Sequence, residues 1–183
     1  MGALGDAGGV VTNDEQTFEK LFQLHDHGRD TNGNTKSWGR NSRLDNLQAA
    51  ILNTKFASYS NVITRRREIA SIYDSRLRNL EQLRLPKAPD SEPDHFDIFQ
   101  NYELEADNRD ELRTFLSQNN IGTLIQWGGK GVHQWEELNF NLVIPGVEEF
   151  FKKCMLLPMN LFISNEDVHF ICDKIEAFYK NAK

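Results

Sequence analysis

The most informative stretch of the chain reads Gly39-Arg40-Asn41-Ser42-Arg43-Leu44-Asp45-Asn46-Leu47-Gln48. The spacing of Leu44 and Leu47 with Ile51 and Leu52 predicts a helix with one apolar face, which begins near Asn41. Helix N-termini attract anions through their free N–H groups. The Asn41 amide and the Arg43 guanidinium would add donors suited to a phosphate. The plainer alternative is that Asn41 or Ser42 only caps the helix and that Arg43 is a surface residue.

A second stretch near the N-terminus is rich in glycine and reads Gly5-Asp6-Ala7-Gly8-Gly9-Val10-Val11-Thr12-Asn13. Its backbone N–H groups could cradle a phosphate, but it lacks the Lys-Ser/Thr ending of a P-loop. Spacing alone favours a tight turn that feeds a strand at its β-branched end. Asn13 or Asp14 can then cap a helix that carries Phe18, Leu21, Phe22 and His25 on one face.

Composition narrows the class of protein. The chain has 183 residues, 39% of them hydrophobic, and a net charge of −6. It can bury a core in one domain or somewhat more, and it lacks the excess of basic residues that a nucleic-acid partner requires. The basic run Arg65-Arg66-Arg67 is predicted to be a solvated helix face or a subunit contact. With neither a membrane-length apolar run nor a signal-peptide pattern, we expect a cytoplasmic protein without a membrane partner.

Cysteine and histidine offer little chemistry by spacing alone. Cys154 and Cys172 fall in apolar helical patterns and are predicted to be small buried hydrophobes, with no zinc motif around them. His25 lies on an apolar stripe and is expected in a core. His133 follows the loop Gly128-Gly129-Lys130-Gly131, where a flexible backbone beside His and Lys makes a ligand site plausible, although a structural role is the more common outcome.

Three of the five prolines gather in residues 85–97, which we interpret as a linker. Beyond it the pattern predicts a strand over 98–104, a helix from Asp107, a strand over 121–127 and a helix over 146–154. A capping box at Ser164 and Asp167 predicts the last helix.

Taken together, these segments resemble the DegT-type sugar-nucleotide aminotransferase family. The resemblance covers nearly the whole chain, and its parts occur in the family's order: 5–13, His27-Gly28, 41–52, 65–69, Gly122-Thr123 and 157–159. It implies an α/β fold: the C-terminal part of a fold type I transferase dependent on pyridoxal phosphate, comprising the end of the large domain and the small α/β domain. The implied division is residues 1–84 for the large-domain part and interface helices, 85–97 for the linker, and 98–183 for the small domain.

The resemblance also implies a reaction. Family members use pyridoxal 5'-phosphate to move an amino group from an amino acid, usually glutamate, to a keto-sugar on a nucleotide for polysaccharide or glycoside biosynthesis. They act as homodimers whose active sites lie at the interface. Asn41 matches the family asparagine that reaches the cofactor phosphate of the neighbouring subunit. Arg43 matches a basic position that faces the substrate phosphates, and His133 matches a histidine near the substrate mouth.

Two departures from the family pattern matter. The family commonly has His-Tyr-Pro where this chain has Gln126-Trp127-Gly128, which indicates a particular group of substrates. The family's cofactor lysine is expected just upstream of Met1, so no catalytic residue is assigned and we expect the 183-residue chain alone to be inactive. The alternatives are a non-catalytic interaction module or remnant of the same fold, or a dehydratase relative in which histidine replaces the lysine.

Overall fold

The structure is a computed structural model that describes residues 2–181. Met1, next to which the cofactor lysine was expected, and residues 182–183 lie outside the described part. The chain divides into two compact units, residues 1–60 and 61–183. The expected division at residues 85–97 concerns the domains of the whole protein and stays a prediction.

The first unit contains two helices, α1 (Glu15–His25) and α2 (Asn46–Phe56). Asp14 caps α1 by accepting a hydrogen bond from the Thr17 amide at 2.7 Å, which confirms the expected helix start. Two expectations are wrong here. The glycine-rich stretch carries no strand, because residues 10–12 find no strand to pair with among the described residues. The second helix begins at Asn46 with Asp45 as its cap, so Asn41 and Arg43 lie before the helix and not at its start.

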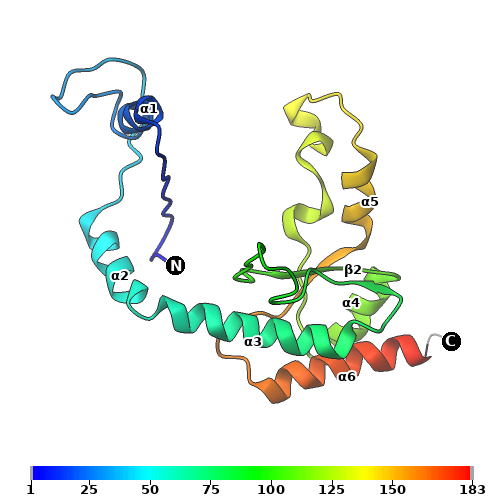
Figure 1. The fold of residues 1–183 in the computed structure, drawn as a ribbon. Coiled ribbons are helices and arrows are strands. Elements are labelled where there is room, and N and C mark those ends of the chain that lie inside the picture. Colours follow the sequence, from blue (N-terminus) through cyan, green and yellow to red (C-terminus); the bar gives the residue numbers. More distant parts are fainter. Residues whose placement is uncertain (1, 182–183) are drawn as a thin grey trace. The chain divides into compact units, whose positions relative to one another are not determined.

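The second unit is built on a small antiparallel sheet in the order β1 (Leu83–Arg84), β2 (Tyr102–Ala106) and β3 (Cys154–Leu157). Tyr102 pairs with Leu157 and Leu104 with Met155. Helices α3 (Tyr59–Leu77) and α6 (Asn165–Asn181) run parallel beside each other (Figure 1). Arg65 bonds Asn165 near one end of this helix pair, and Arg76 bonds Glu176 near the other.

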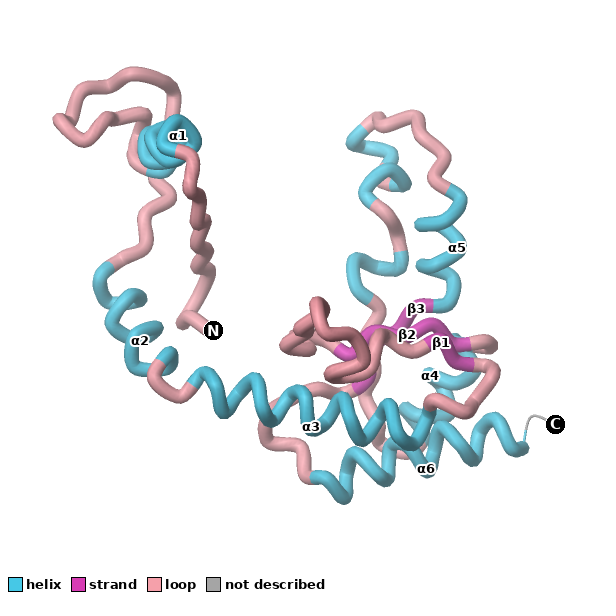
Figure 2. Tube along the Cα trace, in the orientation of Figure 1, coloured by secondary structure: helices cyan, strands magenta, loops and turns pink. Residues whose placement is uncertain are grey.

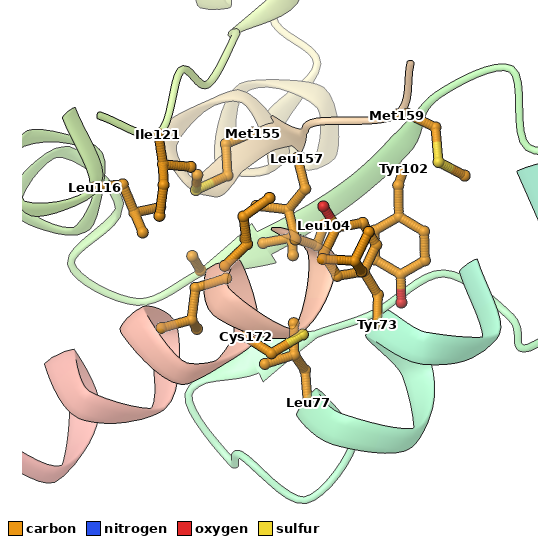
Figure 3. Packing of buried hydrophobic residues seen from close by; sticks show 14 of the residues in the cluster. Tyr73, Leu77, Tyr102, Leu104, Leu116, Ile121, Met155, Leu157, Met159 and Cys172 are labelled. Carbon is orange, nitrogen blue, oxygen red and sulfur yellow. The ribbon is translucent and has the colours of Figure 1, made fainter. Parts of the chain in front are cut away.

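The core lies between these helices and the sheet, and α4 (Arg109–Gln118) adds to it. Tyr73 and Leu77 from α3 meet Tyr102 and Leu104 from β2 and Cys172 from α6 (Figure 3). The alternating burial of β2 agrees with the strand expected there, although the strand begins four residues later than predicted. Both cysteines are buried and free, as expected, and burial raises the pKa of the Cys172 thiol to about 12.

An arm of short helices projects from the sheet between residues 124 and 153 (Figure 2). It comprises the 3-10 turns η1 (Gln126–Gly129), η2 (Val132–Gln134) and η3 (Glu136–Leu138), followed by helix α5 (Pro145–Lys153). The strand expected over 121–127 is wrong: only Leu124 bridges to Leu156. Trp127 and Gly128 adopt left-handed φ angles of 53° and 65°, which an extended strand cannot accommodate.

The arginine run of α3 binds chain segments of its own unit. Arg65 donates to the Ile163 carbonyl and the Asn165 side chain, and Arg67 donates to the Asp97 carbonyl and Asp90. Arg66 Nη1 donates to the carbonyl oxygens of Phe99 at 2.9 Å and Gln100 at 2.5 Å. The solvated face or subunit contact predicted from sequence is therefore an intramolecular clamp.

Replacing Arg66 by alanine should destabilise the second unit, because it leaves two carbonyl oxygens without their charged donor. We expect a loss of about 1.5–3 kcal/mol in the free energy of unfolding, measured by urea denaturation. The control is Lys87→Ala, which removes an ion pair between two exposed side chains, Lys87 and Glu92, and should cost less than about 0.5 kcal/mol. Equal losses in the two variants would contradict the clamp.

Two buried tyrosines give a second, matched prediction. The Tyr73 hydroxyl donates to the Pro158 carbonyl at 2.8 Å, whereas the buried Tyr102 hydroxyl has no partner among the described residues. Tyr73→Phe should therefore lower stability by about 0.5–1.5 kcal/mol, while Tyr102→Phe should leave it unchanged or raise it. Thermal unfolding of the two variants beside the parent chain tests this difference, and a larger loss for Tyr102→Phe would refute it.

Candidate active-site residues

In the first unit, Asn41 and Arg43 lie on a strand-like segment held against the end of α1. The His27 amide donates to the Arg40 carbonyl, and the Arg40 amide donates to the Leu24 carbonyl. Asn41 forms an isolated antiparallel bridge with Asp26. These bonds fix residues 40–42 against the C-terminal end of α1. Residues 40–42 therefore do not form the N-terminus of a helix, and the free N–H groups of such an N-terminus are not part of this position.

Two glycines allow the close approach of this segment. A Cβ atom on Gly39 would lie 2.2 Å from the Gly28 nitrogen, and one on Gly28 would lie 1.7 Å from the Ser37 carbonyl oxygen. Gly28 also has a left-handed φ of 77°, which glycine adopts without strain. The polar loop between the two glycines is thus closed at its base by backbone contact that a side chain would prevent.

Asn41 and Arg43 touch each other. Arg43 Nε donates to Asn41 Oδ1 at 3.2 Å, and Arg43 Nη1 lies 3.1 Å from the Asp26 carboxylate. The Asp26 oxygen is buried without a hydrogen bond, so this contact is an ion pair without hydrogen-bond alignment. The Arg43 side chain keeps 48% of its surface exposed.

These two residues fit a phosphate group. The Asn41 side chain is exposed, its amide oxygen accepts a hydrogen bond from Arg43, and none of the described residues accepts one from its two amide N–H groups. Arg43 adds further guanidinium donors beside them. One neutral and one charged donor, side by side and exposed, can bind an anion by charge-assisted hydrogen bonds.

His133 belongs to the second unit and its imidazole is buried. The side chain is 3% exposed, and Nε2 lies 3.3 Å from Glu148 Oε1 on α5. Gly131 packs against the ring so closely that a Cβ atom there would lie 2.7 Å from His133 Cε1. The ring therefore joins η2 to α5, and its predicted role at a substrate mouth stays a prediction.

A cavity of about 820 Å³ in the second unit lies between the 3-10 turns of the arm and α5. Its walls include Trp127, Lys130, Val132, Trp135, Val147 and Phe151. Trp127 stays 75% exposed although its left-handed backbone costs about 1–2 kcal/mol. The burial of the indole is too small to offset this strain, and residues with such backbone strain are common at functional sites.

The sequence singled out the glycine loop and the Gln126-Trp127-Gly128 segment, but not the other walls of the cavity. Trp135, Val147 and Phe151 were not selected, although the i, i+4 spacing of the last two indicates one helix face. Among the described residues, no group of His, Cys, Asp and Glu side chains could hold a metal ion. None of the helices between residues 2 and 181 has the length and apolar character needed to cross a bilayer.

Known proteins resemble this chain over nearly its whole length. It is 30% identical to the dTDP-3-amino-3,6-dideoxy-alpha-D-galactopyranose transaminase of Aneurinibacillus thermoaerophilus, over 97% of this chain and 53% of the relative. It is 29% identical to the pleiotropic regulatory protein of Geobacillus stearothermophilus, over 99% of this chain and 49% of the relative. The chain thus spans about half the length of these relatives.

Solved structures agree with the sequence relatives. The crystal structure of S. venezuelae DesV in complex with a ketimine intermediate matches with a TM-score of 0.86 and 28% identity. The match covers 97% of this chain and 48% of DesV. The expected fold class, an α/β fold that forms the C-terminal part of a fold type I transferase, is confirmed by this match. The model of the DegT/DnrJ/EryC1/StrS aminotransferase family matches residues 1–176, and the chain belongs to this family.

Proposed function

We propose that the protein carrying this chain transfers an amino group from an amino acid, usually glutamate, to a keto-sugar linked to a nucleotide. The family match over residues 1–176 carries this proposal. It is supported by relatives that are transaminases of dTDP-linked sugars. The reaction would serve polysaccharide or glycoside biosynthesis in the cytoplasm.

Asn41 and Arg43 are the residues we assign to anion binding. Pyridoxal phosphate, when bound, supplies the electron sink that lets the amino group move. The exposed amide of Asn41 would hold the phosphate of that cofactor, and Arg43 would face the phosphates of the nucleotide sugar. We place both roles across the interface of a homodimer, so that each chain completes its partner's site. Orientation by fixed donors is the contribution that these residues make to rate.

The lysines of this chain do not suit the role of cofactor anchor. A lysine that acts as a nucleophile near neutral pH needs a pKa lowered by burial, and none of the lysines between residues 2 and 181 is buried. Glu149 raises the pKa of Lys152, and Asp107 raises that of Lys153. Both amines therefore stay protonated at neutral pH, and we propose that the 183-residue chain alone is inactive.

A non-catalytic regulatory role is the second candidate. It is favoured by one observation, the name of the Geobacillus stearothermophilus relative, a pleiotropic regulatory protein that matches 99% of this chain. An activity measurement on a protein that includes this chain separates the two candidates.

Adding pyridoxal phosphate to the purified 183-residue chain tests whether any of its lysines binds the cofactor covalently. We expect no stoichiometric visible absorbance that borohydride fixes to a single lysine, because none of the described lysines is buried. Absorbance spectra before and after reduction, followed by peptide mass analysis, provide the measurement. Modification of one lysine in full yield would overturn this part of the proposal, whereas weak labelling scattered over several exposed lysines would support it.

A chimera tests the reaction and Asn41 together. The chain is joined to the part of the Aneurinibacillus thermoaerophilus transaminase that it does not cover, and 2-oxoglutarate formation from glutamate is measured with nucleotide-linked keto-sugars. We expect activity, and we expect Asn41→Ala to weaken cofactor affinity about 10- to 150-fold through the loss of one charge-assisted bond.

Asn53→Ala, on the exposed surface of α2, is the matched control and should change nothing. A folded chimera that binds the cofactor but transfers no amino group would favour the regulatory candidate. Equal cofactor affinities for Asn41→Ala and Asn53→Ala would remove Asn41 from the site.

A further inference from the structure

The cavity of the arm is lined mainly by aromatic and apolar side chains, which favour a ligand with apolar faces. Two indoles, Trp127 and Trp135, are 75% and 40% exposed, and apolar side chains from α5 form the opposite wall. Lys130 and Glu137 are the charged residues among the described lining. We infer that this cavity binds the base of the nucleotide that carries the sugar, an inference that rests on the proposed function.

Planar bases fit this lining better than sugars do. A base has two apolar faces, and base stacking on aromatic side chains tolerates any base. A sugar ring would bring several hydroxyl groups against walls that offer few hydrogen-bond partners, which costs free energy for each unpaired group. The volume of about 820 Å³ falls within the range of pockets for small ligands.

The side chain of Trp127 is exposed while its backbone adopts a strained, left-handed conformation. Trp127 is a bulky residue in the left-handed region, followed by Gly128 and Gly129 with φ of 65° and 73°. This turn holds the indole outward at the cavity and not in the core. Strained residues cluster at binding sites, and the exposure of Trp127 leaves its indole free to contact a ligand.

Lys130 supplies the charge that a nucleotide requires. Its ammonium group lies 5.6 Å from the centroid of the Trp135 ring, and it pairs with no carboxylate among the described residues. Because this ammonium group lies over one face of the Trp135 indole, we expect the base to stack on Trp127 with its attached phosphates toward Lys130. Glu137 can accept a hydrogen bond from a ribose hydroxyl or from a base N–H group.

His133 acts as a positioning residue for the cavity. Its buried imidazole links η2 to Glu148 of α5, and Glu148 also accepts a hydrogen bond from the Ile144 amide at 3.2 Å. Gly131, beside His133, lines the cavity itself. The two walls of the cavity are therefore held together from behind by side chains that the ligand does not touch.

Tryptophan fluorescence of the 183-residue chain tests the inference directly. The chain has three tryptophans, and Trp38 lies in the first unit, 95% exposed. In a Trp38→Phe background the remaining signal comes from the two cavity indoles alone. UDP and dTDP should change it saturably, and uridine should do so with lower affinity. Glucose 1-phosphate and pyrophosphate should leave the fluorescence unchanged. Free tryptophan, titrated with the same ligands, corrects for absorption of light by the nucleotides.

Variants separate stacking from charge. Asparagine tolerates the left-handed conformation, so Trp127→Asn should keep the thermal midpoint of unfolding while weakening UDP binding about 5- to 150-fold, the loss of one stacked base. Calorimetry measures both affinities. Lys130→Gln should weaken UDP but not uridine. Its control, Lys152→Gln on the exposed surface of α5, should weaken neither.

The inference is overturned if glucose 1-phosphate matches UDP, if no nucleotide binds, or if Trp127→Asn binds UDP as tightly as the parent chain. These results leave the proposed function to the chimera assay. If the chain binds nucleotides but the chimera transfers no amino group, the proposed function is wrong and the base site stands. If the chimera transfers an amino group but the cavity binds no nucleotide, the base site is wrong and the proposed function stands.

Discussion

The second unit depends on hydrogen bonds from the arginine run of α3 to backbone carbonyl groups. Arg66 and Arg67 bind the carbonyls of residues 97, 99 and 100, and Arg65 binds that of residue 163. These segments lead directly into β2 and α6. Carbonyl groups in such irregular segments need donors when they are partly buried. The clamp therefore places the central strand, and that strand places β3 at the base of the arm.

Local signals in the sequence were sufficient for the starts of α1 and α6, but not for that of α2, which begins at Asn46. Asp14 and the Ser164–Asp167 capping box act within one turn of the chain, and the structure forms both. The strands were harder, because a strand needs a partner that local pattern cannot supply. β3 was missed since its four buried residues do not alternate. The strand expected over 121–127 does not form, because Leu124 makes only an isolated bridge to Leu156 and Trp127 turns left-handed.

At the candidate sites, too, local contacts could be predicted from the sequence and contacts between distant residues could not. The contact between Asn41 and Arg43 spans two residues and follows from their proximity in the sequence. The pairing of Asn41 with Asp26 depends on two glycines that close a loop, and no spacing rule predicts it. The cavity depends on α5 folding back beside the 3-10 turns, and the burial of His133 depends on Glu148, fifteen residues further on.

One wall of the cavity comes from the segment where the sequence resemblance predicts a departure from the family pattern. There Gln126-Trp127-Gly128 forms the strained turn that exposes an indole. A proline in place of Gly128 could not adopt the left-handed φ that this turn requires. The glycine and the exposed tryptophan therefore form one structural unit, in which the backbone conformation permits the side-chain position. Gln126-Trp127-Gly128 therefore contributes an exposed indole to the cavity, while the buried His133–Glu148 contact joins η2 to α5.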